Sequence, residues 1–299
     1  MVLDLKNVTK TFGDKKAVAN LNMTVNPGQV MGLIGQNGAG KTTTFRMILD
    51  FIKADSGSII TWKGKEITPQ VKQKIGFLPE ERGLYQKLTV EDQILYFAEL
   101  HGMKRSDAKE KLNTWMNRLE VVGKVTDKVQ TLSKGNAQKV QLIATIIHEP
   151  EFLILDEPFT GLDPVNTALM MQEINRLKEQ GAAIIFSSHN MDGVEKLSDD
   201  LTMLKNGKTV LQGGVREIRD SFGRTQIYLE SDDDTNDLLN IPGVESVNKS
   251  GQGRILRLEN EEVGLRVFEY VARDGYVQSF MQAPPTLDEI FRAEVAINE

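Results

Sequence analysis

The 299-residue sequence contains no cysteine, which excludes disulfide bridges and every metal site that depends on thiolate ligands. It also lacks long apolar runs: the most apolar stretches, Phe152–Leu155 and Ala182–Phe186, are only as long as a strand. A membrane-spanning helix needs about 20 apolar residues. The first residues show no basic segment followed by an apolar one. We therefore expect neither a signal peptide nor a membrane span in this chain.

Basic residues are scarce in the last third of the chain. Residues 214–299 carry 9 Lys and Arg against 17 Asp and Glu, whereas residues 1–213 carry 27 against 25. A nucleic-acid-binding tail would carry the opposite excess, so this balance argues against nucleic acid as a partner. An acidic docking patch is one explanation, but a solvated acidic surface is the commoner one.

The length predicts two domains, because a domain usually has about 100–200 residues. Up to about residue 213, apolar strand-like runs such as Val30–Ile34, Phe152–Asp156 and Ala182–Ser187 alternate with helical patterns. Continuous apolar runs are typical of a mainly parallel sheet covered on both faces. We therefore predict an α/β domain over residues 1–213, with a helical subdomain at about 85–150.

A second, smaller α+β domain is predicted for residues 214–299, because the composition changes at Gly213 and Gly214. The order strand, helix, strand, strand, helix, strand is the ferredoxin-like arrangement. A final helix is expected from Thr286, where Thr286 and Glu289 have the spacing of a capping box. The expected segments are Thr225–Glu230, Val244–Asn248, Ile255–Leu258 and Val277–Met281 for the strands and Glu261–Ala272 for the second helix.

A glycine-rich segment ending in Lys41 and Thr42 lies between the strand Val30–Ile34 and a helix predicted over Thr43–Ile52. Such a loop turns several backbone N–H groups towards one anion, and the helix N-terminus adds positive potential. The lysine can reach the β- and γ-phosphates, and the threonine hydroxyl can ligate Mg²⁺. A glycine turn with an unrelated lysine is the alternative. The residues expected around the phosphates are Gly35, Gln36, Asn37, Gly38, Ala39, Gly40, Lys41, Thr42 and Thr43.

Two acids follow the apolar run Phe152–Leu155. Asp156 is expected at the carboxyl end of the sheet, where a carboxylate can hold Mg²⁺ through water. Glu157 comes next and is expected to polarise the attacking water. An acidic pair at a strand end is often only a cap, but the phosphate loop upstream favours the catalytic reading.

Four further segments resemble motifs of the ABC ATPases and occur in that family's order. Residues 132–139, Leu-Ser-Lys-Gly-Asn-Ala-Gln-Lys, resemble the signature motif, and Gly161–Pro164 resembles the D-loop. His189, after the strand Ala182–Ser187, resembles the switch histidine. Phe12 lies where the family stacks an aromatic ring on adenine.

This resemblance implies a P-loop NTPase fold that binds ATP and Mg²⁺. It implies that Ser133, Gly135 and Asp163 contact ATP held by another protomer, in a homodimer or a heterodimer with a second ABC ATPase. It also implies that His189 contacts the γ-phosphate and that Phe12 contacts adenine. Taken alone, Ser133 could be a plain helix cap, His189 an ordinary structural histidine and Phe12 a core residue.

Three residues depart from the common family pattern. Lys134 and Asn136 replace a glycine and a glutamine of the signature, and Glu80 stands where the Q-loop glutamine is usual. These variants, together with residues 283–291, resemble a bacterial subgroup of sodium-exporter-like ABC ATPases. The resemblance therefore implies export.

Glu80 follows a predicted strand, Ile75–Leu78, and is expected to be a third ligand of the magnesium ion beside Thr42 and Asp156. A solvated loop residue is the alternative. Leu84, Tyr85 and Leu88 come directly afterwards, and these apolar residues are expected to form a docking groove for a permease. Tyr85 could instead anchor the core.

The favoured hypothesis is an ATPase subunit that docks on a separate integral membrane permease at the cytoplasmic face of the plasma membrane. A soluble ABC ATPase acting on ribosomes or nucleic acid is the alternative. The ribosome-associated type usually fuses two ATPase domains, and DNA-repair types carry coiled-coil or zinc insertions, for which this chain shows neither heptads nor cysteines. A nucleotide-sensing regulator would fit the loss of Glu157 or His189, but both are present.

Overall fold

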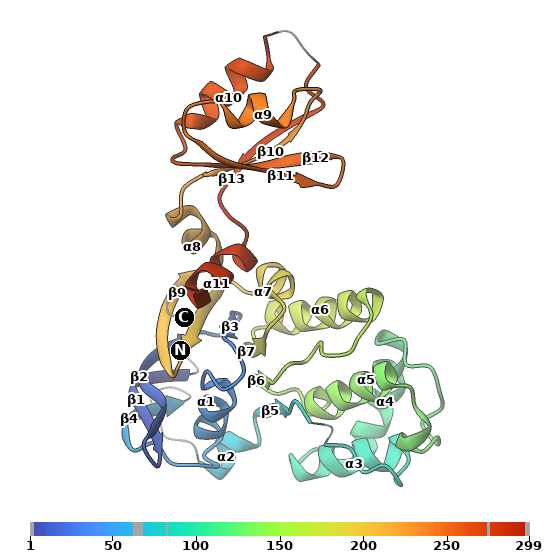
Figure 1. The fold of residues 1–299 in the computed structure, drawn as a ribbon. Coiled ribbons are helices and arrows are strands. Elements are labelled where there is room, and N and C mark those ends of the chain that lie inside the picture. Colours follow the sequence, from blue (N-terminus) through green and yellow to red (C-terminus); the bar gives the residue numbers. More distant parts are fainter. Residues whose placement is uncertain (1–2, 62–67, 82, 274–275, 297–299) are drawn as a thin grey trace. The chain divides into compact units, whose positions relative to one another are not determined.

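The computed structural model describes residues 3–61, 68–81, 83–273 and 276–296. The chain forms two compact units, Met1–Gln212 and Gly213–Glu299 (Figure 1).

A six-stranded sheet forms the centre of the first unit, in the order β5-β6-β7-β3-β8-β9. The pairs β5/β6, β6/β7, β7/β3 and β3/β8 are parallel. Every residue of β3, β6 and β7 is buried, which is why these strands read as continuous apolar runs. The predicted parallel α/β fold is therefore confirmed. The strands are β3 (Val30–Ile34), β5 (Ile75–Leu78), β6 (Phe152–Leu155), β7 (Ala183–Ser188), β8 (Asp200–Lys205) and β9 (Lys208–Gly214).

A three-stranded antiparallel sheet, in the order β2-β1-β4, shares a core with this parallel sheet. Its strands are β1 (Leu3–Phe12), β2 (Lys15–Val25) and β4 (Ser56–Thr61). Helix α1 (Lys41–Ile48) buries Phe45 and Ile48 in the same core. The prediction of a helix over Thr43–Ile52 placed both ends wrongly: α1 begins at Lys41 and ends at Ile48, since Asp50 adopts a left-handed φ of 60°.

Between β5 and β6 the chain is mostly helical (Figure 1). Helix α5 is the central element of this part, since every residue from Ala137 to Ile146 is buried. Its first turn is capped by Ser133, whose hydroxyl accepts a hydrogen bond from the Asn136 N–H at 3.2 Å. The helices of the first unit besides α1 are α2 (Pro69–Lys72), α3 (Val90–Leu100), α4 (Arg105–Arg118), the 3₁₀-helix η1 (Val129–Thr131), α5 (Lys134–Ile146), α6 (Pro164–Glu179) and α7 (Met191–Leu197).

The second unit contains an antiparallel four-stranded sheet in the order β11-β12-β10-β13. With α9 and α10 this gives the ferredoxin-like βαββαβ order that the sequence predicts. It has its own apolar core, which includes Ile227, Leu256 and Val267. Its elements are α8 (Val215–Ser221), β10 (Gln226–Glu230), α9 (Thr235–Leu239), β11 (Val244–Ser250), β12 (Gly253–Leu258), α10 (Val263–Val271), β13 (Ser279–Ala283) and α11 (Leu287–Ala296).

The capping box predicted at the start of the last helix is present. The Thr286 N–H donates to Glu289 Oε2 at 2.9 Å, and the Glu289 N–H donates to Thr286 Oγ1 at 3.3 Å. The strand expected over Val277–Met281 lies two residues later, at Ser279–Ala283. In the part of the chain that the structure describes, no helix has the length and apolar character to cross a bilayer.

Candidate functional site

The glycine-rich loop joins β3 to α1 and is packed tightly against neighbouring strands. A Cβ atom on Gly35 would lie 2.4 Å from the Leu204 carbonyl oxygen of β8, and one on Gly40 would lie 2.4 Å from the Ala17 carbonyl oxygen of β2. Lys41 is buried, and its Nζ donates to the Gly35 carbonyl at 2.7 Å and to the Gln36 carbonyl at 3.3 Å. The loop therefore wraps around the Lys41 ammonium group at the start of α1.

A cleft of about 440 Å³ opens beside this loop. It brings together residues from four segments that are far apart in the sequence. Of the residues predicted around the nucleotide, it is lined by Phe12, Asn37, Gly38, Gly40, Lys41, Thr42, Thr43, Glu80, Asp156 and Glu157, together with Lys15 and Ala17.

Phe12 is 52% exposed at the end of β1, so its ring is available at the mouth of the cleft and does not belong to the core. The Lys10 ammonium lies 5.5 Å from the centroid of this ring. An exposed aromatic face beside a phosphate-binding loop can stack on a nucleobase.

Asp156 is held by two hydroxyl groups at the carboxyl end of β6. The Ser187 hydroxyl donates to Asp156 Oδ1 at 2.5 Å, and the Thr42 hydroxyl lies 3.2 Å from Asp156 Oδ2. Burial raises the pKa of the Asp156 carboxyl, while the hydrogen bonds from Ser187 and Thr42 oppose that rise. Because the effect of burial outweighs these hydrogen bonds, the ionised carboxylate would be stabilised by a nearby cation.

The oxygen atoms gathered here suit Mg²⁺. A hydroxyl and a carboxylate are hard ligands, and Mg²⁺ is usually bound through one or two carboxylates together with substrate phosphates. Among the described residues, no group of three or more His, Cys, Asp and Glu side chains could hold a metal ion by itself. Thr42 and Asp156 therefore fit a magnesium ion that arrives with a nucleotide.

Glu157 occupies an unusual backbone conformation. Its φ is 49°, a left-handed value that costs a residue other than glycine roughly 1–3 kcal/mol. Glu157 is 7% exposed, and its Oε2 lies 2.9 Å from His189 Nδ1 and 3.4 Å from the Thr160 hydroxyl. The surrounding structure thus holds this carboxylate at the edge of the cleft, with an imidazole beside it.

Ser133, Gly135 and Asp163 do not line the cleft of their own chain. They belong instead to two adjoining helix starts. Ser133 caps α5, and Asp163 caps α6 by accepting from the Asn166 N–H at 2.8 Å. The two starts are close, because a Cβ atom on Gly135 would lie 3.7 Å from a side-chain carbon of Leu162. The structure thus brings these three residues together, away from the phosphate loop.

Ser187 is a site residue that the sequence motifs do not predict. It is fully buried, and its oxygen accepts the Glu157 N–H at 2.9 Å while its hydroxyl donates to Asp156. One serine therefore fixes the backbone of one acid and the carboxylate of the other. A hydroxyl at the end of an otherwise apolar strand was the available signal.

We expect Ser187→Ala to lower both stability and turnover. It leaves the Glu157 N–H and Asp156 Oδ1 without this partner, and each unsatisfied buried group costs about 1–3 kcal/mol. ATP hydrolysis should fall about tenfold, and the thermal midpoint should fall by several degrees. Ser188→Ala is the matched control, since its hydroxyl bonds Asn190 and neither acid. Equal turnover in the two variants would contradict the role given to Ser187.

Comparison with known proteins gives two family matches. Residues 18–160 match the ABC transporter family, and residues 213–295 match the C-terminal domain of DrrA1-3-like ATP-binding proteins. A Bacillus subtilis protein, the uncharacterized ABC transporter ATP-binding protein YhaQ, is 44% identical over 98% of this chain and 98% of its own length. The Nod factor export ATP-binding protein I of Rhizobium etli is 30% identical over 97% of this chain and 92% of its own. A solved ATP-binding subunit of an ABC transporter superposes with a TM-score of 0.69 and 28% identity, over 74% of this chain and 93% of that one.

Proposed function

This chain belongs to the ABC transporter ATP-binding proteins, and we propose that it powers export through a separate membrane permease. It is an ATPase subunit that binds ATP with Mg²⁺ and hydrolyses it. The observation that carries the proposal is the cleft in which the phosphate loop, Asp156, Glu157 and Glu80 meet. Export is supported by the Rhizobium etli relative, whose name states that activity.

The residues of the cleft, and His189 beside it, receive roles from their chemistry. Lys41 and the loop amides bind the phosphates, and Phe12 stacks on adenine. Glu157 accepts the proton of the attacking water, and His189, which contacts it, orients that carboxylate and reaches the γ-phosphate. The loop residues concerned are Gly35, Gln36, Asn37, Gly38, Ala39, Gly40, Lys41, Thr42 and Thr43.

The metal ligands are assigned to Thr42, Asp156 and Glu80. The first two are adjacent, and Glu80 lines the same cleft. When bound, magnesium neutralises negative charge on the phosphate oxygens. A carboxylate in place of the family's glutamine adds a full negative charge, so Glu80 should strengthen the dependence of the site on the cation.

Ser133, Gly135 and Asp163 are assigned to the nucleotide of a second ABC ATPase protomer. The assignment rests on their exclusion from the cleft of their own chain and on the two helix starts that they share. The start of α5 presents backbone N–H groups and has no acid in its first turn, so it suits a phosphate. The partner protomer is either a second copy or a related chain.

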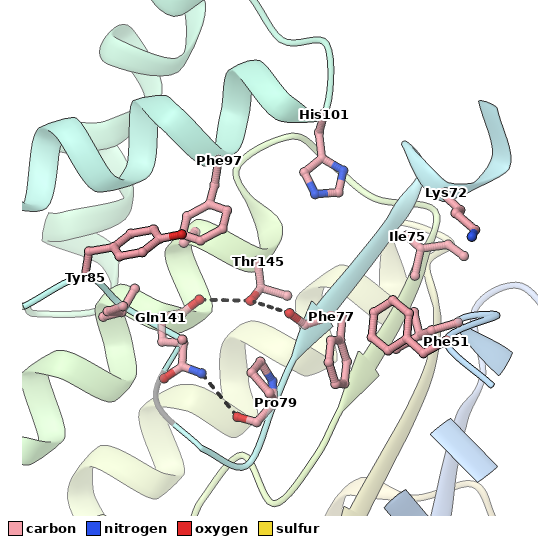
Figure 2. Close-up of a pocket in the computed structure, with 14 residues that line it drawn as sticks. Phe51, Lys72, Ile75, Phe77, Pro79, Tyr85, Phe97, His101, Gln141 and Thr145 are labelled. Atoms are coloured by element: carbon pink, nitrogen blue, oxygen red, sulfur yellow. Dashed lines mark hydrogen bonds between the residues drawn. The ribbon is translucent and has the colours of Figure 1, made fainter. Parts of the chain in front are cut away.

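A mainly apolar groove of about 480 Å³ lies between β5, α3 and α5, and we assign it to a short helix of the permease (Figure 2). Tyr85 is 57% exposed and lines the groove, so it is no core anchor. Leu84 also lines it, but Leu88 does not, so the assignment of the groove includes Leu84 and Tyr85 and leaves Leu88 out. The apolar lining comprises Leu49, Phe51, Ile75, Phe77, Pro79, Leu84, Tyr85, Phe97 and Ala144.

Tyr85→Ala should weaken permease binding and spare basal ATP hydrolysis. A buried interface tyrosine contributes about 2 kcal/mol or more, which corresponds to roughly 30-fold in affinity. The tagged full-length chain is used to capture partners from detergent-solubilised membranes of the source organism. A multi-span membrane protein should be recovered with the parent chain and lost with Tyr85→Ala.

The matched control is Leu100→Ala, because Leu100 is also 57% exposed but does not line the groove. It should recover the permease as the parent chain does. Ribosomes or nucleic acid in place of a multi-span protein would overturn the transport function. Equal recovery by both variants would overturn only the assignment of the groove.

The proposed transport function places the chain at the cytoplasmic face of the plasma membrane.

Residues 214–299 are proposed to be a separate accessory domain that regulates or dimerises the ATPase. The separate core of this unit supports independence, and every nucleotide motif lies before it. A chain truncated after Gly213 should therefore bind ATP with the affinity of the full chain, as isothermal titration measures. Loss of ATP binding by a truncated chain with an intact circular dichroism spectrum would refute that independence.

A further inference from the structure

Gln141 connects α5 to the loop that carries Glu80. Its Nε2 donates to the Pro79 carbonyl at 3.1 Å (Figure 2). The same nitrogen lies 3.4 Å from the Glu81 carbonyl. Pro79 and Glu81 are the two residues that flank Glu80 in the sequence. One side-chain amide therefore contacts the backbone carbonyls on both sides of Glu80, which lines the nucleotide cleft.

Gln141 is buried, and these hydrogen bonds explain why a polar side chain occupies a buried position. Gln141 is 4% exposed, and its Oε1 has no hydrogen-bond partner among the described residues. An unsatisfied buried carbonyl costs about 1–3 kcal/mol. A methionine would fill the same volume without that cost, so packing alone does not account for a glutamine here.

A second glutamine of α5 makes the same kind of contact with the residue next to the other acid, Glu157. Gln138 lies three residues earlier on the helix, which places it on the same face. It is buried, and its Nε2 donates to the Pro158 carbonyl at 3.0 Å. Pro158 follows Glu157 directly. Helix α5 thus contacts the loops of both Glu80 and Glu157, and Ser133 caps its start.

We propose that Gln141 is a positioning residue that sets the distance of Glu80 from Asp156 and the phosphate loop, with Gln138 acting on Glu157 in the same way. The proposal rests on the proposed function, in which Glu80 holds Mg²⁺. It adds that α5, the helix capped by Ser133, fixes the geometry of both acids. Because Gln141 also lines the groove, a helix seated there touches the side chain that positions the metal-binding loop.

The test compares Gln141→Met and Gln141→Glu, which keep the length of the side chain but remove its N–H donor. Loss of a residue that orients a metal ligand typically costs about 10–100-fold in metal affinity. Each variant should raise the Mg²⁺ concentration for half-maximal ATPase activity at least about tenfold, with little change in the KM for ATP at saturating Mg²⁺.

Gln282→Met is the matched control. Gln282 also bridges two carbonyls through Nε2, those of Arg224 at 2.8 Å and Glu261 at 2.7 Å, in the unit without nucleotide motifs. Its Mg²⁺ titration should match that of the parent chain. A shift as large as that of Gln141→Met would reduce the effect to general destabilisation and overturn the proposal.

A double variant, Glu80→Gln with Gln141→Met, decides whether Gln141 acts through Glu80. If it does, the double variant is no worse than Glu80→Gln alone, whereas independent effects multiply. Multiplied effects, or an unmoved titration in Gln141→Met, overturn the proposal while leaving the ATPase function intact. A parent chain that hydrolyses no ATP would overturn the proposed function instead, so the two failures are distinguishable.

Discussion

Glu157→Gln should bind ATP with the affinity of the parent chain and hydrolyse it about 10²–10⁴ times more slowly. Glutamine keeps the shape of the side chain but cannot accept the proton of water. The backbone N–H still reaches the Ser187 oxygen, and the phosphate loop is unchanged, so binding is preserved. Steady-state phosphate release measures the turnover, and isothermal titration measures the affinity.

The same variant should accumulate as an ATP-loaded dimer. In the proposed dimer, each protomer contributes Ser133, Gly135 and Asp163 to the other's nucleotide, and the two separate after hydrolysis. Blocked hydrolysis should therefore double the mass seen by light scattering. Glu151→Gln is the matched control. Glu151 directly precedes β6, and its carboxylate pairs with Lys74 at 2.6 Å, away from the cleft. Undiminished hydrolysis by Glu157→Gln would remove it from the catalytic machinery.

The nucleotide loop and the two acids could be predicted because each is a local pattern. A glycine-rich turn between strand and helix, or an acid at the end of an apolar strand, can be recognised without knowing which strands are neighbours. The boundaries of α1 could not be predicted in this way. Leu49 and Ile52 continue its apolar face, and both contact the core. Periodicity does not report the left-handed φ of Asp50 that ends the helix.

Ser187 and Gln141 could not be predicted because their partners lie on other elements. Ser187 reaches Asp156 only because β6 and β7 are paired, and that pairing is a property of the folded sheet. Gln141 lies in a segment whose apolar residues predict a buried helix, and nothing in its spacing relates it to Pro79. Such contacts are fixed by tertiary packing, which sequence periodicity does not describe.

The sequence likewise does not distinguish the glycines of the phosphate loop from one another, whereas in the structure the space around each of them differs. Gly40→Ala should weaken ATP binding at least about 100-fold, which corresponds to about 2.7 kcal/mol. Gly40 has a φ of 114°, and an added Cβ would lie 2.4 Å from the Ala17 carbonyl oxygen. That neighbour is backbone and has no rotamer to change, so either β2 or the loop must move. Isothermal titration with ATP and Mg²⁺ measures the loss.

Gly181→Ala separates the collision from the backbone strain. Gly181 has a similar φ of 97°, but an added Cβ would meet nothing within 4 Å, and it lies outside the cleft. It should lose about 1–2 kcal/mol of stability from the left-handed backbone alone, with ATP affinity retained. Gly40→Ala adds the collision, so its thermal midpoint should fall further, by roughly 2–4 °C for each additional kcal/mol. If Gly40→Ala bound ATP as Gly181→Ala does, the loop could move away from β2 without losing its hold on the phosphates. The contact with Ala17 would then have no part in shaping the site, because the N–H groups would converge on the anion without it.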